Sequence, residues 1–310
     1  MPPLPARPLT LARAASAPRL TLAALALCSL SACEPAPPGA PLPQTPPTDA
    51  EQLAARPYLL DVPRGYQAGV AAPLVLLLHG YGSSAASVEA WYQLRPLALG
   101  GEGAGFLYAR PEGTRDSTGS RNWNFSPVHA YPFDSDYLRA VIDDVKGKYS
   151  VDPRRVYVIG VSAGGHMAHR VGCELASRVA AIISVSGQVL TDPALCAPGA
   201  PVSVLQVHGD ADPVIPYHGD PENPALPSAL DTIGVWRRND GCSGPLAATG
   251  RRLDLTRDVA GEETAVSAYN GCPPGIGVEL WTLEGVGHHP DVQPTWASQL
   301  YGFLSAHPRP

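Results

Sequence analysis

The residues best suited to chemistry lie in the segment Gly160-Val161-Ser162-Ala163-Gly164. This segment follows an apolar run that predicts a strand, and it opens a stretch that predicts a helix, which is the context of a nucleophile elbow. Glycines on both sides of the serine leave room for a sharp turn and for close approach of the strand and the helix. We therefore expect Ser162 to act as a nucleophile.

A serine hydroxyl attacks only when a base takes its proton, and nine histidines compete for that role. Proteins with a nucleophile elbow carry the base late in the chain, and Gly287-His288-His289-Pro290 follows the last predicted strand. We favour His288, with His289 as the alternative. A metal site at this pair is disfavoured, because adjacent side chains rarely converge on one ion and no H-E-x-x-H motif is present. The other histidines are expected to shape strand-end turns (His79, His208), to face neighbouring helices or solvent (His166, His169), or to lie in loops and the tail (His129, His218, His307).

The third member of such a triad is a carboxylate that lies between the serine and the histidine in sequence. The segment His208-Gly209-Asp210-Ala211-Asp212 follows a predicted strand and offers two candidates. Asp212 lies deeper in the loop, and we expect it to accept a hydrogen bond from the imidazole and fix its tautomer. Asp210 is expected to be a turn residue that caps its own backbone.

A tetrahedral intermediate also needs hydrogen-bond donors for its oxyanion. The segment His79-Gly80-Tyr81-Gly82 ends the first long apolar run, at the place where such proteins supply one backbone donor. We expect the backbone N–H groups of Tyr81 and Ala163 to form the pair. The alternative is that this segment is a glycine turn with no catalytic part.

The elements that position these residues alternate along the chain. Continuous apolar runs predict strands buried on both faces, and apolar stripes with helical spacing predict helices. The alternation implies one α/β domain over residues 56–308, with a mostly parallel central sheet and helices on both faces. The predicted strands are 74–78, 106–108, 156–159, 181–185, 202–207 and 278–283, and the predicted helices are 133–145, 164–175, 228–238 and 295–304.

The N-terminal segment has the pattern of an export signal, with arginines before an apolar run at 20–32 that is too short to span a bilayer. Leu30-Ser31-Ala32-Cys33 resembles the lipobox of bacterial lipoproteins, so residues 1–33 predict a lipoprotein signal peptide with Cys33 as the lipidation site. An ordinary cleaved signal peptide is the alternative. Residues 34–55 are rich in Pro and Ala and predict a tether. We expect an exported protein, either lipid-anchored at the periplasmic face or outer surface of the cell envelope, or secreted.

Four cysteines follow the signal: Cys173, Cys196, Cys242 and Cys272. An even number in an oxidising compartment predicts two disulfides. Three pairings are possible, and Cys242–Cys272 with Cys173–Cys196 is favoured because the first pair flanks one insertion-like stretch. The spacing lacks the C-x₂₋₄-C pair of a structural zinc site.

Charge argues against a nucleic-acid partner. The chain carries 22 basic and 28 acidic residues, a net charge of −6. Three of the arginines lie in the signal, which leaves 19 basic residues against 28 acidic ones, a net charge of −9. The chain therefore lacks the basic footprint that binding phosphate backbones requires. Membrane contact is expected only through the lipid anchor, and the sequence does not define an oligomeric state.

Four segments, HGYG at 79–82, GVSAGG at 160–165, HGDADPVIPY at 208–217 and GVGHHP at 285–290, occur in an order and spacing that resemble the polyhydroxybutyrate depolymerase-like esterases. That family includes bacterial feruloyl esterases and lipoprotein esterases. The resemblance covers residues 56–306 and implies the α/β-hydrolase fold. It also implies the same roles for the residues above: Ser162 as nucleophile, Asp212 as acid, His288 as base, and Tyr81 and Ala163 as oxyanion donors.

The resemblance extends to three shorter segments. Residues 239–242 and 269–272 are similar to the two cysteine segments of the family, which implies the Cys242–Cys272 pairing. Residues 121–124 are similar to a tryptophan-containing loop near its pocket, so Trp123 is a candidate to pack against an acyl group, with a purely structural aromatic as the alternative. The family usually has a tryptophan after the catalytic histidine, as GH-x-WP. Here His289-Pro290 follows directly, which shortens that loop.

These observations predict a serine carboxylic-ester hydrolase that works through an acyl-enzyme, without a metal or organic cofactor. The resemblance implies small or oligomeric substrates: hydroxycinnamoyl (feruloyl), acetyl or short hydroxyalkanoate esters. Polymer-degrading members commonly carry an extra binding module that this sequence does not show, so a soluble ester is favoured over a solid polyester. The alternatives are a polyhydroxybutyrate or oligomer depolymerase, a serine peptidase, and a non-catalytic surface lipoprotein on a hydrolase scaffold.

Overall fold

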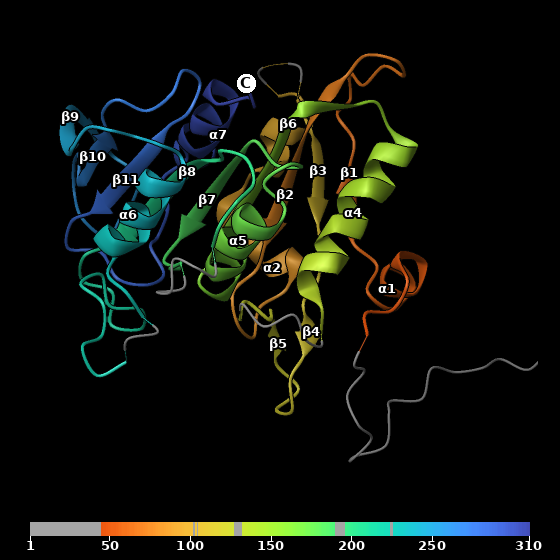
Figure 1. The fold of residues 1–310 in the computed structure, drawn as a ribbon, viewed down its shortest axis with the longest axis horizontal. Helices are drawn as coiled ribbons and strands as arrows, with labels where there is room; N and C mark the ends of the chain where they lie inside the picture. The colour runs from red at the N-terminus through yellow and green to blue at the C-terminus, as the bar shows by residue number, and fades with distance from the viewer. Residues whose placement is uncertain (1–44, 102, 104, 127–131, 190–195, 224–225) are drawn as a thin grey trace, which may run out of the picture. The chain divides into compact units, whose positions relative to one another are not determined.

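The computed structural model describes residues 45–310, apart from 102, 104, 127–131, 190–195 and 224–225. In this part of the chain, nine strands form one sheet in the order β1-β3-β2-β6-β7-β8-β11-β10-β9 (Figure 1). The inner strands from β3 to β11 are parallel to their neighbours, which confirms the predicted sheet, and β1, β10 and β9 add antiparallel edges. The strands are β1 (Leu59–Asp61), β2 (Ala72–Leu78), β3 (Leu107–Arg110), β6 (Val151–Val161), β7 (Ala181–Val185), β8 (Ser203–Gly209), β9 (Leu246–Leu253), β10 (Thr264–Tyr269) and β11 (Val278–Leu283), and β4 (Thr114–Arg115) pairs with β5 (Arg121–Asn122) in a separate hairpin.

Strand β2 shows why the apolar runs are continuous. Successive side chains of a strand point to opposite faces of the sheet. Leu74, Leu76 and Leu78 pack in the core on one face, and Val75 and Leu77 pack in the core on the other, all fully buried. A strand with helices on both sides therefore needs apolar residues at every position.

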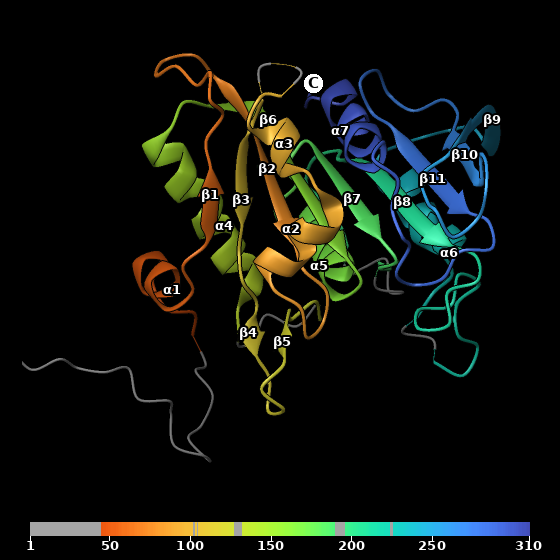
Figure 2. The same ribbon diagram turned by 180° about the vertical axis from the view of Figure 1, so that it is seen from behind.

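Helices cover both faces of the sheet. Helices α4 (Asp134–Lys148), α5 (Ala163–Glu174) and α6 (Ala229–Asn239) contribute buried residues to one core and lie in front of the sheet in Figure 1. Helices α2 (Ala85–Tyr92), α3 (Arg95–Ala98) and α7 (Trp296–Ala306) contribute to the other core and come to the front in Figure 2. The four helices predicted from the sequence are confirmed, each within a few residues of its expected bounds.

The tether prediction is wrong for its last residues. Residues 49–55 form helix α1 (Asp49–Ala55), which begins with a capping box between Thr48 and Glu51. Arg139 of α4 binds the Asp49 carboxylate through two hydrogen bonds, of 2.7 and 2.9 Å, and Gln52 is buried. The folded domain thus begins at α1, because ion pairing and burial outweigh a composition that lacks an apolar stripe. Cys33 and the rest of the predicted signal lie outside the described residues.

The described residues contain two disulfides, and both have the pairing favoured from the sequence. Cys173–Cys196 joins the end of α5 to the segment before β8, and Cys242–Cys272 joins the residues after α6 to those after β10. They close loops with sequence separations of 23 and 30 residues. Loops of this size correspond to stabilisation of roughly 3–4 kcal/mol each in the chain-entropy view. Disulfides fit an exported protein. In the described part of the chain, every helix is too short or too polar to cross a bilayer.

Candidate active site

Ser162 stands at a strained turn between β6 and α5. Its backbone has φ 54° and ψ −121°, a conformation that costs a non-glycine residue about 1–3 kcal/mol and is typical of functional sites. The flanking glycines are required: a Cβ on Gly160 would lie 2.0 Å from the Gly164 carbonyl oxygen, and one on Gly164 would lie 2.4 Å from the Leu78 oxygen. The turn is also held by the Ser162 N–H, which donates to the Val185 carbonyl at 2.8 Å. The fold thus fixes the serine in the strained turn expected from the sequence.

The structure brings the three predicted residues Ser162, His288 and Asp212 together from three separate loops. Nε2 of His288 lies 3.0 Å from Ser162 Oγ, and its Nδ1 lies 2.7 Å from Asp212 Oδ2. Asp212 and His288 are both 6% exposed, which keeps this chain of hydrogen bonds away from competing water. The arrangement can move a proton from the serine hydroxyl to the imidazole and stabilise the imidazolium that forms.

The two runner-up residues have other places. His289 is exposed, and its ring packs against Trp91 at 5.9 Å. Asp210 accepts a hydrogen bond of 2.6 Å from the Gly285 N–H, so it holds the turn after β11 instead of capping its own backbone as we expected. The difference arises because β8 and β11 are neighbours, which places the two loops that follow them side by side.

The Asp212 carboxylate has further hydrogen-bonding partners in addition to His288. Its Oδ1 accepts from the N–H groups of Val214 and Ile215 at 2.8 and 2.9 Å, and His208 Nε2 lies 3.4 Å from its Oδ2. Burial by itself raises the pKa of Asp212, but hydrogen bonds from His208 and His288 and from the two backbone N–H groups outweigh it. The net pKa lies far below the ordinary aspartate value, so the carboxylate stays ionised at neutral pH.

A buried polar chain behind Asp212 was not predicted. Trp236 of α6 donates to His169 Nδ1 at 3.0 Å, and His169 Nε2 lies 3.0 Å from Gln206 Oε1. The Gln206 amide nitrogen lies 3.2 Å from His208 Nδ1, and His208 in turn approaches Asp212. Burial lowers the pKa of His169 to about 3, so its ring is neutral. The signal in the sequence was the pair Gln206 and His208, two polar residues on one face of a largely apolar strand.

The predicted oxyanion donors lie on either side of the serine. As the first residue of α5, Ala163 has an N–H with no helical carbonyl four residues before it. The segment after β2 approaches from the other side, where a Cβ on Gly80 would lie 3.4 Å from Ser162 Cβ. The Tyr81 side chain is 54% exposed, and its hydroxyl lies 3.2 Å from Thr118 Oγ1. Only the backbone of Tyr81 is therefore a candidate for the oxyanion site.

The expectation that Trp123 binds substrate is wrong in this structure. Its side chain is 2% exposed and belongs to the core that contains α4 and α5. Its indole N–H donates to the His79 carbonyl at 2.8 Å, and its ring lies 5.0 Å from the His79 imidazole. A buried indole has no face left for an acyl group, so Trp123 instead supports the segment after β2.

A different tryptophan supports the shortened loop after the histidine. Trp91 of α2 donates its indole N–H to the Pro290 carbonyl at 2.8 Å. Trp91 therefore contacts the end of the GHHP segment, residues 287–290. The family usually has a tryptophan at this end of the segment, and this sequence lacks it. Among the described residues, no group of three or more His, Cys, Asp and Glu side chains could hold a metal ion.

Comparison with known proteins gives relatives that are named esterases. The alpha/beta hydrolase fold family matches residues 120–216. A protein of Nocardia uniformis subsp. tsuyamanensis, named as the esterase NocK, is 32% identical over 280 residues, which cover 84% of this chain and 74% of that protein. Feruloyl esterase B of Piromyces equi is 27% identical over 242 residues, which cover 75% of this chain and 42% of that protein. Among solved structures, the acetyl xylan esterase from Aspergillus awamori aligns with a TM-score of 0.58 at 14% identity, over 80% of this chain and 93% of that one, which shows a shared fold.

Proposed function

Since this chain belongs to the esterase family of α/β-hydrolases and is a carboxylic-ester hydrolase, we propose that Ser162, His288 and Asp212 are its catalytic triad. The observation that carries the proposal is the continuous hydrogen-bonded chain, with 3.0 Å from Ser162 Oγ to His288 Nε2 and 2.7 Å from His288 Nδ1 to Asp212 Oδ2. A serine in a strained elbow, a histidine within reach and a buried carboxylate behind it are the parts that acyl transfer needs.

In the first half-reaction, Ser162 Oγ attacks the ester carbonyl carbon while His288 Nε2 takes the hydroxyl proton. The carbonyl oxygen becomes an oxyanion that accepts hydrogen bonds from the N–H groups of Tyr81 and Ala163, a contribution of about 3 kcal/mol for each donor. The intermediate then collapses, the bond to the alkoxy oxygen breaks, and His288 gives its proton to the leaving alcohol. The acyl group remains on Ser162 as an ester.

In the second half-reaction, water attacks the acyl-enzyme, and the same groups act in reverse order. His288 takes a proton from the water, the oxyanion forms again at the same two N–H groups, and Ser162 leaves with the proton returned by His288. Asp212 stays ionised throughout, holds the Nδ1–H tautomer of the imidazole and stabilises the imidazolium. Neither half-reaction needs a group from outside the chain other than water.

The proposed substrates are hydroxycinnamoyl (feruloyl), acetyl or short hydroxyalkanoate esters. This choice is supported by the resemblance of the four sequence segments and by a relative named feruloyl esterase. A serine peptidase or a polyester depolymerase would use the same triad, so the leaving group distinguishes these activities. A non-catalytic scaffold would not need a strained serine beside a paired histidine.

The test compares the wild-type chain from Glu34 with its Ser162→Ala variant on methyl ferulate, p-nitrophenyl acetate, a hydroxybutyrate dimer and a peptide p-nitroanilide. We expect ester hydrolysis by the wild type and a loss of at least about 10³-fold in kcat/KM in the variant, in line with loss of a nucleophile. A ferulate preference would assign an aromatic-acid esterase. Equal activity of the two proteins would exclude Ser162 as nucleophile, and faster cleavage of the anilide would favour the peptidase.

We also propose that Cys33 carries a lipid that anchors the domain outside the cytoplasm. The support is the sequence Leu30-Ser31-Ala32-Cys33 after a short apolar run, together with the two disulfides, which fit an oxidising compartment. In a bacterial host, the wild-type protein should sediment with membranes and the Cys33→Ser variant should not yield a lipidated mature form. A wild-type N-terminal peptide that begins at or before Cys33 and carries no lipid mass would contradict lipidation.

A further inference from the structure

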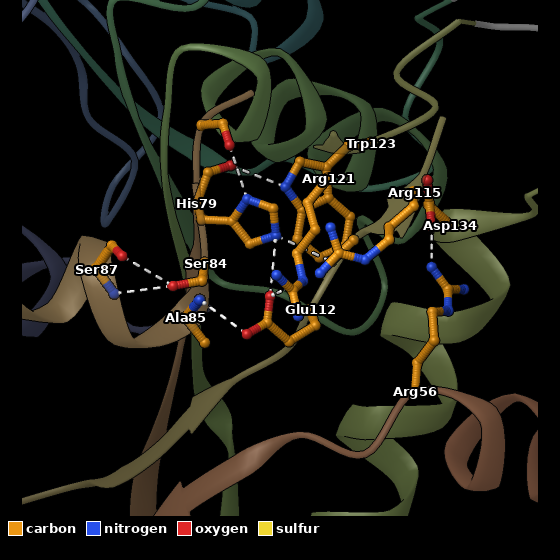
Figure 3. Close-up of polar contacts among 12 residues, drawn as sticks. Arg56, His79, Ser84, Ala85, Ser87, Glu112, Arg115, Arg121, Trp123 and Asp134 are labelled. Atoms are coloured by element: carbon orange, nitrogen blue, oxygen red, sulfur yellow. Dashed lines mark hydrogen bonds and ion pairs between the residues drawn. The ribbon is translucent and has the colours of Figure 1, made fainter. Parts of the chain in front are cut away.

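His79 is a fully buried imidazole with a defined partner on each nitrogen (Figure 3). Its Nε2 lies 2.9 Å from the Gly113 N–H, and its Nδ1 lies 2.8 Å from the Gly80 carbonyl oxygen. A backbone N–H can only donate and a carbonyl can only accept. Nε2 must therefore be unprotonated, and the ring must carry its proton on Nδ1 and donate it to Gly80.

The Gly80 carbonyl belongs to the same peptide group as the Tyr81 N–H. A trans peptide is planar, so these two groups point in opposite directions. A donor that fixes the Gly80 oxygen on one side therefore fixes the direction of the Tyr81 N–H on the other. This N–H is the proposed oxyanion donor of the segment after β2.

The neighbouring peptide groups are also held. The His79 carbonyl accepts from Trp123 at 2.8 Å, and the Gly82 N–H donates to the Arg121 carbonyl at 2.8 Å. The Gly80 oxygen accepts a second, longer hydrogen bond of 3.2 Å from the Ser83 N–H. His79 thus makes the shorter of the two hydrogen bonds to the Gly80 oxygen, and both bonds orient the peptide group next to Ser162.

The charged groups around His79 are engaged elsewhere. Glu112 Oε2 lies 3.5 Å from Nε2, which is too far for a good hydrogen bond, and 2.9 Å from Nε of Arg121. The other oxygen of Glu112 accepts from the Ala85 N–H at 3.1 Å. Burial lowers the pKa of His79, in opposition to its hydrogen bond to Gly80 and the Glu112 charge. The ring is therefore neutral at physiological pH.

We propose that His79, as the neutral Nδ1–H tautomer, is a positioning residue that orients the Tyr81 N–H toward the oxyanion. The proposal rests on the function proposed above and adds the part of the chain that sets the oxyanion geometry. His79 does not touch the substrate and acts through the Gly80–Tyr81 peptide group. The sequence analysis treated this histidine only as a turn residue.

Two substitutions test the roles of the two His79 ring nitrogens separately. In His79→Asn the side-chain amide N–H takes the place of Nδ1–H and can still donate to Gly80, but the acceptor for Gly113 is lost. In His79→Gln the amide oxygen takes the place of Nε2 and can still accept from Gly113, but the donor to Gly80 is lost. Each variant gives up one buried hydrogen bond, so the two should lose similar thermal stability.

The expected result is that the two His79 variants differ in kcat. For p-nitrophenyl acetate, His79→Gln should lose about 10–50-fold in kcat, less than the 10²–10³ of a lost oxyanion donor because Ser83 still holds Gly80. KM should change little, because acylation and deacylation both pass through the oxyanion. His79→Asn should stay within about 3-fold of wild type. The affinity for trifluoroacetophenone, which forms a tetrahedral adduct with the serine, should fall in His79→Gln in parallel with kcat.

Ser84→Ala is the matched structural control. Ser84 caps α2 next to this segment, so its loss should lower the melting temperature without changing kcat. Equal kcat in the two His79 variants at equal stability would overturn the proposal. If His79→Gln does not fold, ¹⁵N shifts of the His79 ring in the wild type decide: a neutral Nδ1–H ring supports the proposal, and an Nε2–H ring or an imidazolium at pH 7 overturns it. Failure of the wild type to hydrolyse any ester would instead refute the proposed function.

Discussion

The two arms of the site reach Ser162 from opposite sides of β6 and are held by different forces. The proposed acid–base arm, Asp212 and His288, follows β8 and β11, and the proposed oxyanion arm, residues 79–82, follows β2 on the other side. Charge holds the acid–base arm, since an ionised carboxylate accepts bonds from an imidazole and two backbone N–H groups. Neutral groups hold the oxyanion arm, where a buried histidine and an indole fix the backbone.

The difference follows from what each arm does. In the proposed mechanism the acid–base arm carries a positive imidazolium, so a fixed negative charge beside it is useful. In the proposed mechanism the oxyanion arm presents a backbone N–H in one direction, and a carboxylate bonded directly to that N–H would compete with the oxyanion for it. Substitutions should therefore affect the two arms differently.

The largest effect is expected on the acid–base arm. Asp212→Asn keeps the shape of the side chain but removes the charge and the preference for the correct imidazole tautomer, so kcat/KM should fall by about 10³–10⁴. Steady-state kinetics on p-nitrophenyl acetate measure this. Asp210→Asn is the matched control, because an amide oxygen can still accept from Gly285, and its activity should stay near wild type. Equal losses in both variants would mean that Asp212 has only a structural role.

The second effect concerns the turn between β6 and α5, which carries Ser162. In Gly164→Ala the new Cβ would lie 2.4 Å from the Leu78 oxygen and 2.6 Å from the His79 oxygen, so it would push the oxyanion arm away from the serine. We expect a loss of at least about 100-fold in kcat together with a lower melting temperature, in line with overpacking and a displaced oxyanion donor. Gly147→Ala in α4 meets open space and should be neutral or stabilising. Normal activity of Gly164→Ala would show that the elbow is more adaptable than the structure indicates.

A third test compares Asp212 with a second buried carboxylate, Asp240, which lies on neither arm. Asp240 accepts one hydrogen bond, from the Val202 N–H at 2.9 Å, and its Oδ2 has no hydrogen-bond partner among the described residues. Burial raises the pKa of Asp240 to about 7, against the lowering effect of that hydrogen bond. The pKa values of these two buried aspartates thus shift in opposite directions, because Asp212 accepts hydrogen bonds from several donors and Asp240 from one.

The sign of the pH effect follows from the raised pKa. The folded state binds the Asp240 proton more tightly than the unfolded state, whose value is near 3.8. Its contribution to stability is therefore fully present below about pH 4 and is lost as the pH rises to about 7. Asp240→Asn cannot ionise and should be more stable than wild type at pH 8, by about 4 kcal/mol at 1.36 kcal/mol per pKa unit. Melting curves from pH 4 to 8 measure this, and a difference independent of pH would contradict it.

The smallest effects are expected for two tryptophans. Each supports one arm through a single hydrogen bond of 2.8 Å. Trp123 donates to His79 on the oxyanion arm, and Trp91 donates to Pro290 on the acid–base arm. Because the acid–base arm has several charged contacts, Trp91→Phe should lose about 2–3-fold in kcat, whereas Trp123→Phe should lose about 10-fold, on the scale of one net hydrogen bond. A larger loss in Trp91→Phe than in Trp123→Phe would show that the oxyanion arm is held by more redundant contacts than the acid–base arm.

The sequence predicted the parts that depend on chain order and short-range pattern. The elbow around Ser162, the acid after β8 and the histidine after β11 follow from the order of motifs, and strands such as β2 follow from continuous apolar runs. Helix α1 could also have been predicted, because Thr48 and Glu51 have the spacing of a capping box.

The parts that were missed depend on contacts between distant segments or on exposed strands. Strand β9 is largely exposed and carries no apolar alternation, so its place at the sheet edge comes only from pairing with β10. The burial of Trp123 depends on how the hairpin after β3 folds back over His79. The chain from Trp236 to Asp212 joins residues of α6, α5 and β8, which no local pattern brings together.

The central claim, that Ser162 carries the acyl group under the control of His288, is tested most directly by trapping the acyl-enzyme. The wild-type protein is mixed with p-nitrophenyl acetate, quenched in acid within the burst phase, digested and analysed by mass spectrometry. The account predicts a single acetyl group on the peptide that contains Ser162 and none on that peptide in Ser162→Ala or at comparable times in His288→Ala. An acetyl group on another residue of an active wild-type enzyme, with Ser162 unmodified, would contradict it.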